Sequence, residues 1–83
     1  MTVGEQLQEF IEKVVREVVD ESEEVRTTLL ESDKTVVVEL EVASTDVGKV
    51  IGREGRMAYA IRTLLTGVST KLGKKAILQI MDP

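Results

Sequence analysis

Near the middle of the chain stands the segment Gly48-Lys49-Val50-Ile51-Gly52-Arg53-Glu54-Gly55-Arg56. An apolar pair runs into two glycines spaced three apart, and basic side chains lie between and around them. Glycine tolerates the backbone angles of a tight corner and has no Cβ to hold a ligand away. A helical pattern begins directly afterwards, so unpaired N–H groups and a positive helix dipole would favour a phosphate there. The segment therefore predicts a helix–loop–helix corner that contacts phosphate or nucleic acid.

The residues around this corner are the candidates for that contact. They are Val47, Gly48, Lys49, Ile51, Gly52, Arg53, Glu54, Gly55 and Arg56. The basic members attract a sugar-phosphate backbone without identifying its sequence, and the apolar members supply a wall where a base can lie. Glu54 departs from this pattern. Its charge opposes phosphate when it faces the ligand and matters little in solvent, because salt screens exposed charges beyond about 10 Å.

Outward from the corner, the flanking sequence predicts two helices and a strand. Ser44-Thr45-Asp46 supplies N-cap candidates for a short helix over residues 46–51. The following helix carries an apolar stripe and stops at Gly73, which is typical of a helix C-terminus. Residues 74–81 then predict a final strand. The stripe consists of Ala58, Ile61, Leu64, Leu65, Val68 and Leu72.

The first part of the chain predicts a helix followed by a hairpin. Thr2 and Glu5 fit a capping box, and apolar residues at helical spacing, Phe10 among them as a core residue, predict a helix over residues 3–20. Residues 25–30 predict a strand, and residues 35–43 alternate between apolar and mostly polar side chains as a half-buried strand does.

The order of these elements predicts the fold class. The short polar turn at residues 32–34 favours an antiparallel hairpin. Two helices separate the strands at 35–43 and 74–81, so these strands can pair in parallel while the helices cover one face. The sequence predicts an α+β fold of order α-β-β-α-α-β, with a three-stranded mixed sheet and helices packed on one face.

Composition limits the chemistry of the chain. Its 83 residues favour a single domain over residues 1–83, and it contains no cysteine and no histidine. Disulfides, thiolate metal sites and the usual neutral-pH general base are therefore missing. No apolar run is long enough to cross a bilayer, and the acidic N-terminal region does not resemble a signal peptide. We expect a cytoplasmic binding protein that is not an enzyme and needs no cofactor, metal or membrane.

Charge is distributed unevenly along the chain. Residues 1–45 carry 12 acidic and 4 basic side chains, a net charge of −8, whereas residues 46–83 carry 3 acidic and 7 basic ones, a net charge of +4. This asymmetry predicts a local basic surface on an acidic body. The overall charge of −4 favours modest, salt-sensitive binding to nucleic acid.

Other phosphate-binding motifs fit the corner poorly. A P-loop needs Lys-Ser or Lys-Thr directly after its last glycine, and Gly55 is followed by Arg56. A dinucleotide-binding fingerprint needs a strand before its glycines, and a short helix is expected there.

The segment Val50 to Arg56, with Gly48 before it and Ile61 after it, resembles the signature of KH domains. The element order resembles the type II form of that fold, and the length is similar to that of small bacterial single-KH proteins of the KhpA family. The resemblance implies that the loop Gly52-Arg53-Glu54-Gly55 grips about four nucleotides of single-stranded RNA in a groove. It also implies that residues 35–43 and the turn before them form the second wall of the groove.

The resemblance further implies partners. Single-stranded RNA is one, and a homodimer or a heterodimer with a second KH-containing protein is the other, with a role as an RNA chaperone. A different function stays open, in which the domain assembles with proteins through Val37, the apolar stripe of the first helix and an exposed Tyr59. Whether Arg62 contacts RNA or only solvates the third helix is also open.

Overall fold

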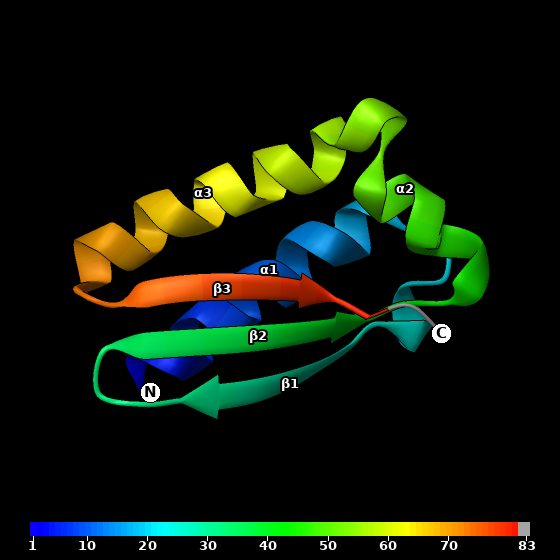
Figure 1. Cartoon of the computed structure of the whole chain (residues 1–83). Coiled ribbons are helices and arrows are strands. Elements are labelled where there is room, and N and C mark those ends of the chain that lie inside the picture. Colours follow the sequence, from blue (N-terminus) through cyan, green and yellow to red (C-terminus); the bar gives the residue numbers. More distant parts are fainter. Residues whose placement is uncertain (82–83) are drawn as a thin grey trace.

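The computed structural model describes residues 1–81, and its element order agrees with the predicted one. The elements are α1 (Val3–Val18), β1 (Arg26–Glu31), β2 (Thr35–Glu41), α2 (Val47–Ile51), α3 (Arg56–Leu72) and β3 (Lys75–Ile80), with short 3₁₀ turns at Ser22–Glu24, Ser44–Asp46 and Arg53–Gly55 (Figure 1). The expected boundaries of the first helix and of the three strands differ from these by no more than two residues.

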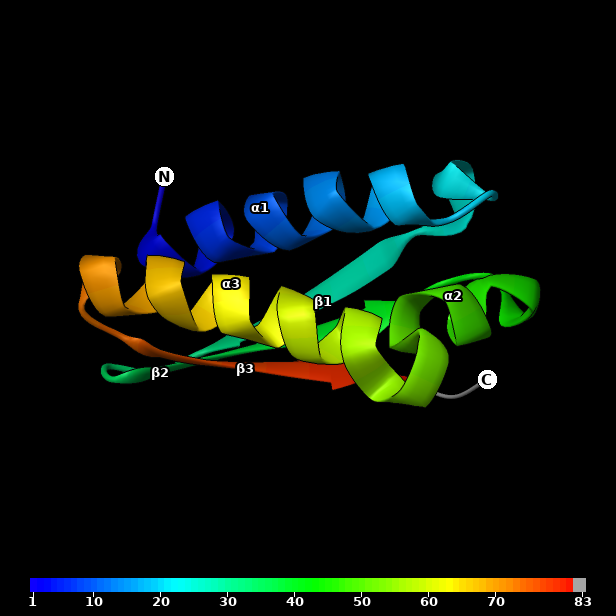
Figure 2. The same ribbon diagram turned by 90° about the horizontal axis from the view of Figure 1, so that it is seen from above.

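The sheet has the strand order β1-β2-β3, so β2 is its central strand. It pairs antiparallel with β1 and parallel with β3, which confirms both predicted pairings. The helices lie on one face of the sheet (Figure 1), and α1 and α3 run antiparallel side by side over it (Figure 2). This arrangement leaves β3 as an edge strand beside α3, with the α2–α3 corner beyond its carboxyl end.

The core forms where β2 meets the helices. Val36, Val38 and Leu40 are fully buried and alternate with less buried residues, as the sequence predicted. Two expected core residues lie at the margin instead. Phe10 is only partly buried against the core, and Leu64 is 54% exposed. The buried stripe of α3 is narrower than the sequence suggested, because the helix rests on the sheet along one row only, consisting of Ala58, Ile61, Leu65 and Ser69.

Of the three N-cap candidates before α2, Asp46 takes the position but does not cap the helix with its side chain. It is 1% exposed, and its carboxylate instead accepts from the backbone N–H groups of Asp20 at 3.3 Å and Glu21 at 2.9 Å. The buried carboxylate thus ties the segment after α1 to the start of α2, and so helps to fix the glycine corner relative to the core.

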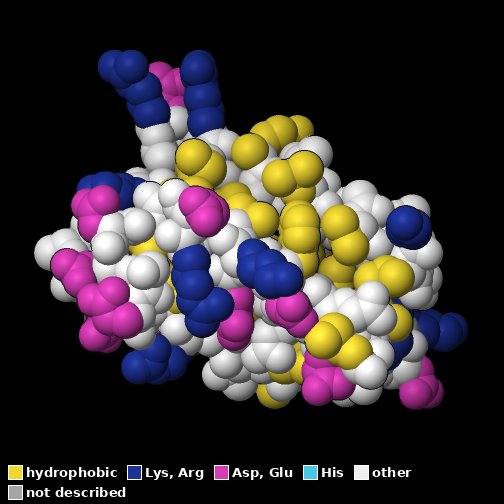
Figure 3. All heavy atoms as spheres, turned by 180° about the vertical axis from the view of Figure 1, so that it is seen from behind, with side chains coloured by type: hydrophobic (Ala, Val, Ile, Leu, Met, Phe, Trp, Pro, Cys, Tyr) yellow, Lys and Arg dark blue, Asp and Glu magenta, His cyan; other side chains and the backbone are white. Residues whose placement is uncertain are grey.

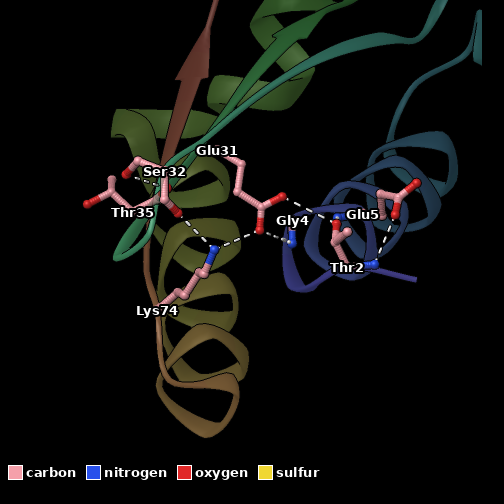
Figure 4. Close-up of polar contacts among 7 residues, drawn as sticks. All are labelled: Thr2, Gly4, Glu5, Glu31, Ser32, Thr35 and Lys74. Carbon is pink, nitrogen blue, oxygen red and sulfur yellow. Dashed lines mark hydrogen bonds and ion pairs between the residues drawn. The ribbon is translucent and has the colours of Figure 1, made fainter.

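A second polar cluster joins the start of α1, the end of β1 and Lys74 before β3 (Figure 4). The Glu31 carboxylate accepts from the Gly4 N–H at 3.1 Å, the Thr2 hydroxyl at 3.3 Å and the Lys74 ammonium at 2.8 Å. Lys74 also donates to the carbonyl of Ser32 at 2.8 Å. The predicted capping box of Thr2 with its partner Glu5 is confirmed in both directions.

This cluster predicts acid sensitivity. The Lys74 ammonium lowers the pKa of Glu31 below its ordinary value of 4.5, and the Gly4 and Thr2 hydrogen bonds act in the same direction. A carboxylate with a depressed pKa in the folded state contributes stability above its unfolded pKa and loses it as pH falls. We expect the free energy of unfolding to fall below about pH 4.5, and to fall less steeply in Glu31→Gln.

Urea unfolding between pH 6 and pH 3, followed by circular dichroism, measures this effect. Lys74→Gln is the companion variant, because it removes the cation that lowers the pKa of Glu31. An acid slope in both variants as steep as that of the parent protein would contradict the role given to the Glu31–Lys74 pair.

Candidate nucleic-acid interface

The predicted corner is a tight loop with an unusual backbone. Gly52 has φ 77° and ψ 176°, Gly55 has φ 75°, and Glu54 between them also has a positive φ of 56°. The Gly52 N–H donates to the carbonyl of Gly48 at 2.8 Å and closes α2, and the Gly55 N–H donates to the Gly52 carbonyl at 3.2 Å. The chain thus leaves α2 and enters α3 within a few residues, as glycine alone readily permits.

The loop presents the N-terminus of α3 to solvent. Gly55 occupies the N-cap position in a left-handed conformation, and no side chain caps the 17-residue helix behind it. The first-turn N–H groups of a helix have no partners within it and carry its positive dipole end. An anion can therefore approach the main chain here with no Cβ at positions 52 and 55 in its way.

A hollow of about 370 Å³ lies beside the loop. Its lining comes from α2, the loop, α3 and the end of β3, and consists of Val47, Ile51, Gly55, Ala58, Arg62, Ile80 and Met81. The expectation that residues 35–43 form the second wall is wrong. Because β2 pairs with β1 on one side and β3 on the other, β3 stands between it and the hollow.

The basic side chains near the corner differ in whether a carboxylate forms an ion pair with them. Lys49 pairs with Asp20 at 3.0 Å, and this carboxylate raises the pKa of the ammonium. Arg56 pairs with Glu54 at 3.4 Å, both side chains being mostly exposed. Within residues 1–81, Arg53 makes no ion pair. Figure 3 shows basic groups projecting from this corner with an acidic one between them. Arg53 is therefore the loop cation that is not offset by a neighbour.

The structure brings the predicted site residues together in two groups. Val47, Ile51 and Gly55 line the hollow, while Gly48 and Lys49 are exposed on the adjoining surface of α2. Glu54 is 72% exposed at its side chain and does not line the hollow, so its charge lies in solvent. Gly52, Arg53 and Arg56 complete the corner.

Sequence reasoning missed part of the lining. The sequence patterns place Ala58, Ile80 and Met81 in a helix stripe or a strand without a role in the site, and they leave open whether Arg62 belongs to it, whereas all four residues line the hollow. For the α3 residues a signal existed, since Ala58 and Arg62 lie three and seven positions after Gly55 and so share its helix face. For Ile80 and Met81 the predicted parallel pairing of the last two strands was a signal, because it brings the end of β3 beside the end of β2 and the corner that follows.

The sequence of this chain is similar to that of a known family of proteins. A family model described as "KhpA/KhpB, KH domain" matches residues 8–80. The chain belongs to this family. Its three helices, mixed three-stranded sheet and element order are those of a type II KH domain, so the expected fold is confirmed.

Similar proteins in the KhpA/KhpB family cover nearly the whole chain. The "RNA-binding protein KhpA" of Aquifex aeolicus is 45% identical over 76 residues, which are 92% of this chain and 96% of that protein. The protein of the same name from Borreliella burgdorferi is 45% identical over 74 residues, covering 89% and 90% of the two chains. The one from Clostridium perfringens is 35% identical over 75 residues, covering 90% and 100%. No solved structure gave a significant match.

Two further observations concern metal ligands and membrane-spanning helices. In the part of the chain that the structure describes, no group of acidic side chains is arranged to hold a metal ion. Among the same residues, no helix has the combination of length and hydrophobicity required to cross a bilayer.

Proposed function

We propose that this protein binds single-stranded RNA and holds about four nucleotides along the loop and the adjoining hollow. The observation that carries the proposal is the uncapped N-terminus of α3 behind a bare glycine corner, directly beside an apolar hollow. The helix N-terminus suits a phosphate and the apolar hollow suits a base, and these two surfaces adjoin each other. The relatives named above as RNA-binding proteins support the same function.

Each part of the site has a defined task in this proposal. The first-turn N–H groups of α3 and the Arg53 guanidinium bind phosphate oxygens by charge-assisted hydrogen bonds. Val47 and Ile51 provide the apolar wall on which a base lies, and Gly48 lets the sugar-phosphate chain pass close to α2. Phosphate contacts of this kind position a strand but do not identify its sequence.

Low sequence specificity follows from this assignment of most contacts to the phosphates. With most of the affinity in backbone contacts, the protein would act on many RNAs as a chaperone or post-transcriptional regulator in the cytoplasm. NMR titration with short unpaired oligonucleotides tests binding directly, and the amides of residues 52–56 are expected to shift. Unchanged amides at saturating RNA would refute the proposal.

Salt dependence provides a quantitative prediction. If two to four phosphates are neutralised on a single strand, the slope of log K against log salt is expected to be about −1.5 to −3. Fluorescence anisotropy between 25 and 200 mM salt, roughly the range over which such slopes are resolved, measures it. A slope near zero would show that bound RNA is not held through its phosphates.

A second candidate function is assembly with another KH-containing protein or with a second copy. Its support is the exposed surface of α3, where Tyr59 is 74% and Leu64 is 54% exposed. The apolar stripe of α1 cannot serve this purpose, because its residues Leu7, Ile11 and Val15 are buried in the core. Val37, the remaining candidate, lies on the open face of the sheet beside Leu30 and Ile77.

Paired leucine variants separate these two faces. Leu64→Asp on α3 is expected to abolish dimerisation, because a charge in an apolar interface is left without a partner. Leu30→Asp is the matched control, since Leu30 is 53% exposed but lies on the sheet. Sedimentation velocity over a concentration series measures the change. Loss of the dimer in Leu30→Asp alone would place the interface on the sheet instead.

A further inference from the structure

Arg62 bridges α3 and the edge of the sheet. Its Nη2 donates to the carbonyl of Leu78 at 3.3 Å. β3 is an edge strand, so backbone groups directed away from β2 lack a ladder partner. Arg62 fills this need for one of them. The contact holds the guanidinium at the edge of β3 rather than leaving it to move freely in solvent.

This position places Arg62 where two hollows meet. It lines the hollow beside the glycine loop and also a second one of about 430 Å³ along β3, and Ile80 and Met81 border both. Ala58, four positions earlier, lies on the same face of α3 and belongs to the first hollow. A strand that leaves the loop along this path therefore passes Ala58 first and the guanidinium about one helical turn, roughly 5 Å, beyond Ala58.

Arg62 is the only polar or charged side chain among the residues that line the first hollow. The other lining residues offer aliphatic or thioether surface, which suits the flat face of a base better than a phosphate. Among the described residues, no carboxylate pairs with Arg62. Its charge is thus available to a ligand, in contrast to that of Lys49 and Arg56.

The chemistry of the guanidinium restricts what it can recognise. It has donors only, arranged in a rigid planar fork. The single hydrogen bond to Leu78 occupies one N–H and leaves a complete bidentate face of the fork for a ligand. Such a face matches two acceptors that lie side by side on one edge. Guanine presents O6 and N7 in this way, and cytosine presents O2 and N3. Adenine and uracil present no edge on which two acceptors lie side by side.

We propose that Arg62 reads one base of the bound RNA and selects cytosine or guanine over adenine and uracil. This inference rests on the proposed RNA-binding function and adds to it a preference at a single position. A bidentate contact of this type discriminates by about fivefold at the lower end of its range, and about tenfold lies within that range. Low specificity over the rest of the site remains, because the loop holds phosphates.

Binding of oligonucleotides that differ in base tests the proposal. The set consists of oligo-C, oligo-U, oligo-A and an oligo-U strand with a single guanine, measured by fluorescence anisotropy on the whole protein. The parent protein is expected to bind oligo-C, the guanine-containing strand or both about tenfold more tightly than oligo-U and oligo-A. The oligo-C and guanine arms then show which of the two bases the fork accepts.

Two substitutions separate base reading from simple charge. Arg62→Lys keeps the charge and a donor for Leu78 but removes the fork, and Arg62→Gln removes the charge as well. Both are expected to lose the base preference, and Arg62→Gln is also expected to lose some affinity for every strand, because it removes a charge beside the hollow. Thermal melting establishes that each variant is folded. An NMR shift of the Arg62 Nε–H with the preferred strand, and not with oligo-U, is the direct signature.

The contrary outcomes are distinct. Equal affinity of the parent protein for all strands, a preference that survives in Arg62→Lys, or an equal loss for every strand in both variants would overturn the role of Arg62. These results leave RNA binding itself intact. Failure of the proposed function appears differently, as no binding of any strand by the parent protein.

Discussion

Gly52→Ala is expected to destabilise the fold by about 2–4 kcal/mol. A Cβ at this position would lie 2.6 Å from the Cβ and 2.8 Å from the backbone nitrogen of Met57. The backbone at φ 77° and ψ 176° is also one that only glycine adopts without strain. The clash is with the Cβ and backbone of Met57 and the strain lies in the backbone of position 52 itself. Moving a flexible side chain can therefore relieve neither cost. Thermal unfolding should show a melting temperature lower by more than about 10 °C.

Two neighbouring glycines supply the controls. Gly55→Ala meets nothing within 4 Å and has only the strain of φ 75°, so its cost is expected to be about 1–2 kcal/mol. Gly48→Ala also meets nothing within 4 Å and lies in α2, where alanine is favoured by up to about 1 kcal/mol. From the most to the least stable variant, the expected order is Gly48→Ala, Gly55→Ala, Gly52→Ala. A Gly52→Ala variant no less stable than Gly55→Ala would contradict the packing at Met57.

Replacing Arg53 and Glu54 together by aspartate is expected to abolish RNA binding. Arg53 is the loop cation without an ion-pair partner in residues 1–81, and reversing its charge turns attraction at the α3 N-terminus into repulsion. A charge-assisted hydrogen bond contributes about 1.5–3 kcal/mol, so affinity should fall by at least about tenfold. The fold is expected to survive, because aspartate tolerates the positive φ of position 54 better than glutamate does.

Lys75→Glu is the matched control for this pair of substitutions. It reverses one exposed basic charge, as Arg53→Asp does, but at the start of β3, away from the glycine corner. RNA affinity measured by fluorescence anisotropy should stay near that of the parent protein in Lys75→Glu and disappear in the double variant. Equal losses in the two proteins would mean that only overall charge matters, and would remove the loop from the site.

Local patterns in the sequence were enough for the elements and their pairing. The Thr2–Glu5 capping box, the alternation along β2 and the stop of α3 at Gly73 each depend on residues a few positions apart. The glycine corner also belongs to this class, since the positive φ angles of its two glycines and its place between two helices follow from residues 48–56 themselves. Such signals are short-range, and propensity and periodicity report them directly.

Other features depended on contacts between distant segments. Nothing near Asp46 in the sequence shows that its carboxylate leaves its own helix to accept from Asp20 and Glu21. The burial of Ile61 and exposure of Leu64 on one helix likewise reflect how α3 is rotated on the sheet. Either residue fits the same periodic stripe, so only the packed neighbours distinguish them.

The sequence by itself determined the element order of a type II KH domain and the glycine corner between α2 and α3, because both are encoded in spacing along the chain. Only the tertiary structure decided which side chains line the hollow beside this corner and which cations near it are ion-paired. Ile80 and Met81 near the end of the chain came to line the hollow together with residues of α2 and α3, and Lys49 was paired with Asp20 across the fold. Spacing along a chain specifies local geometry, whereas strand order and ion pairs arise when remote segments compete for the same neighbours in space.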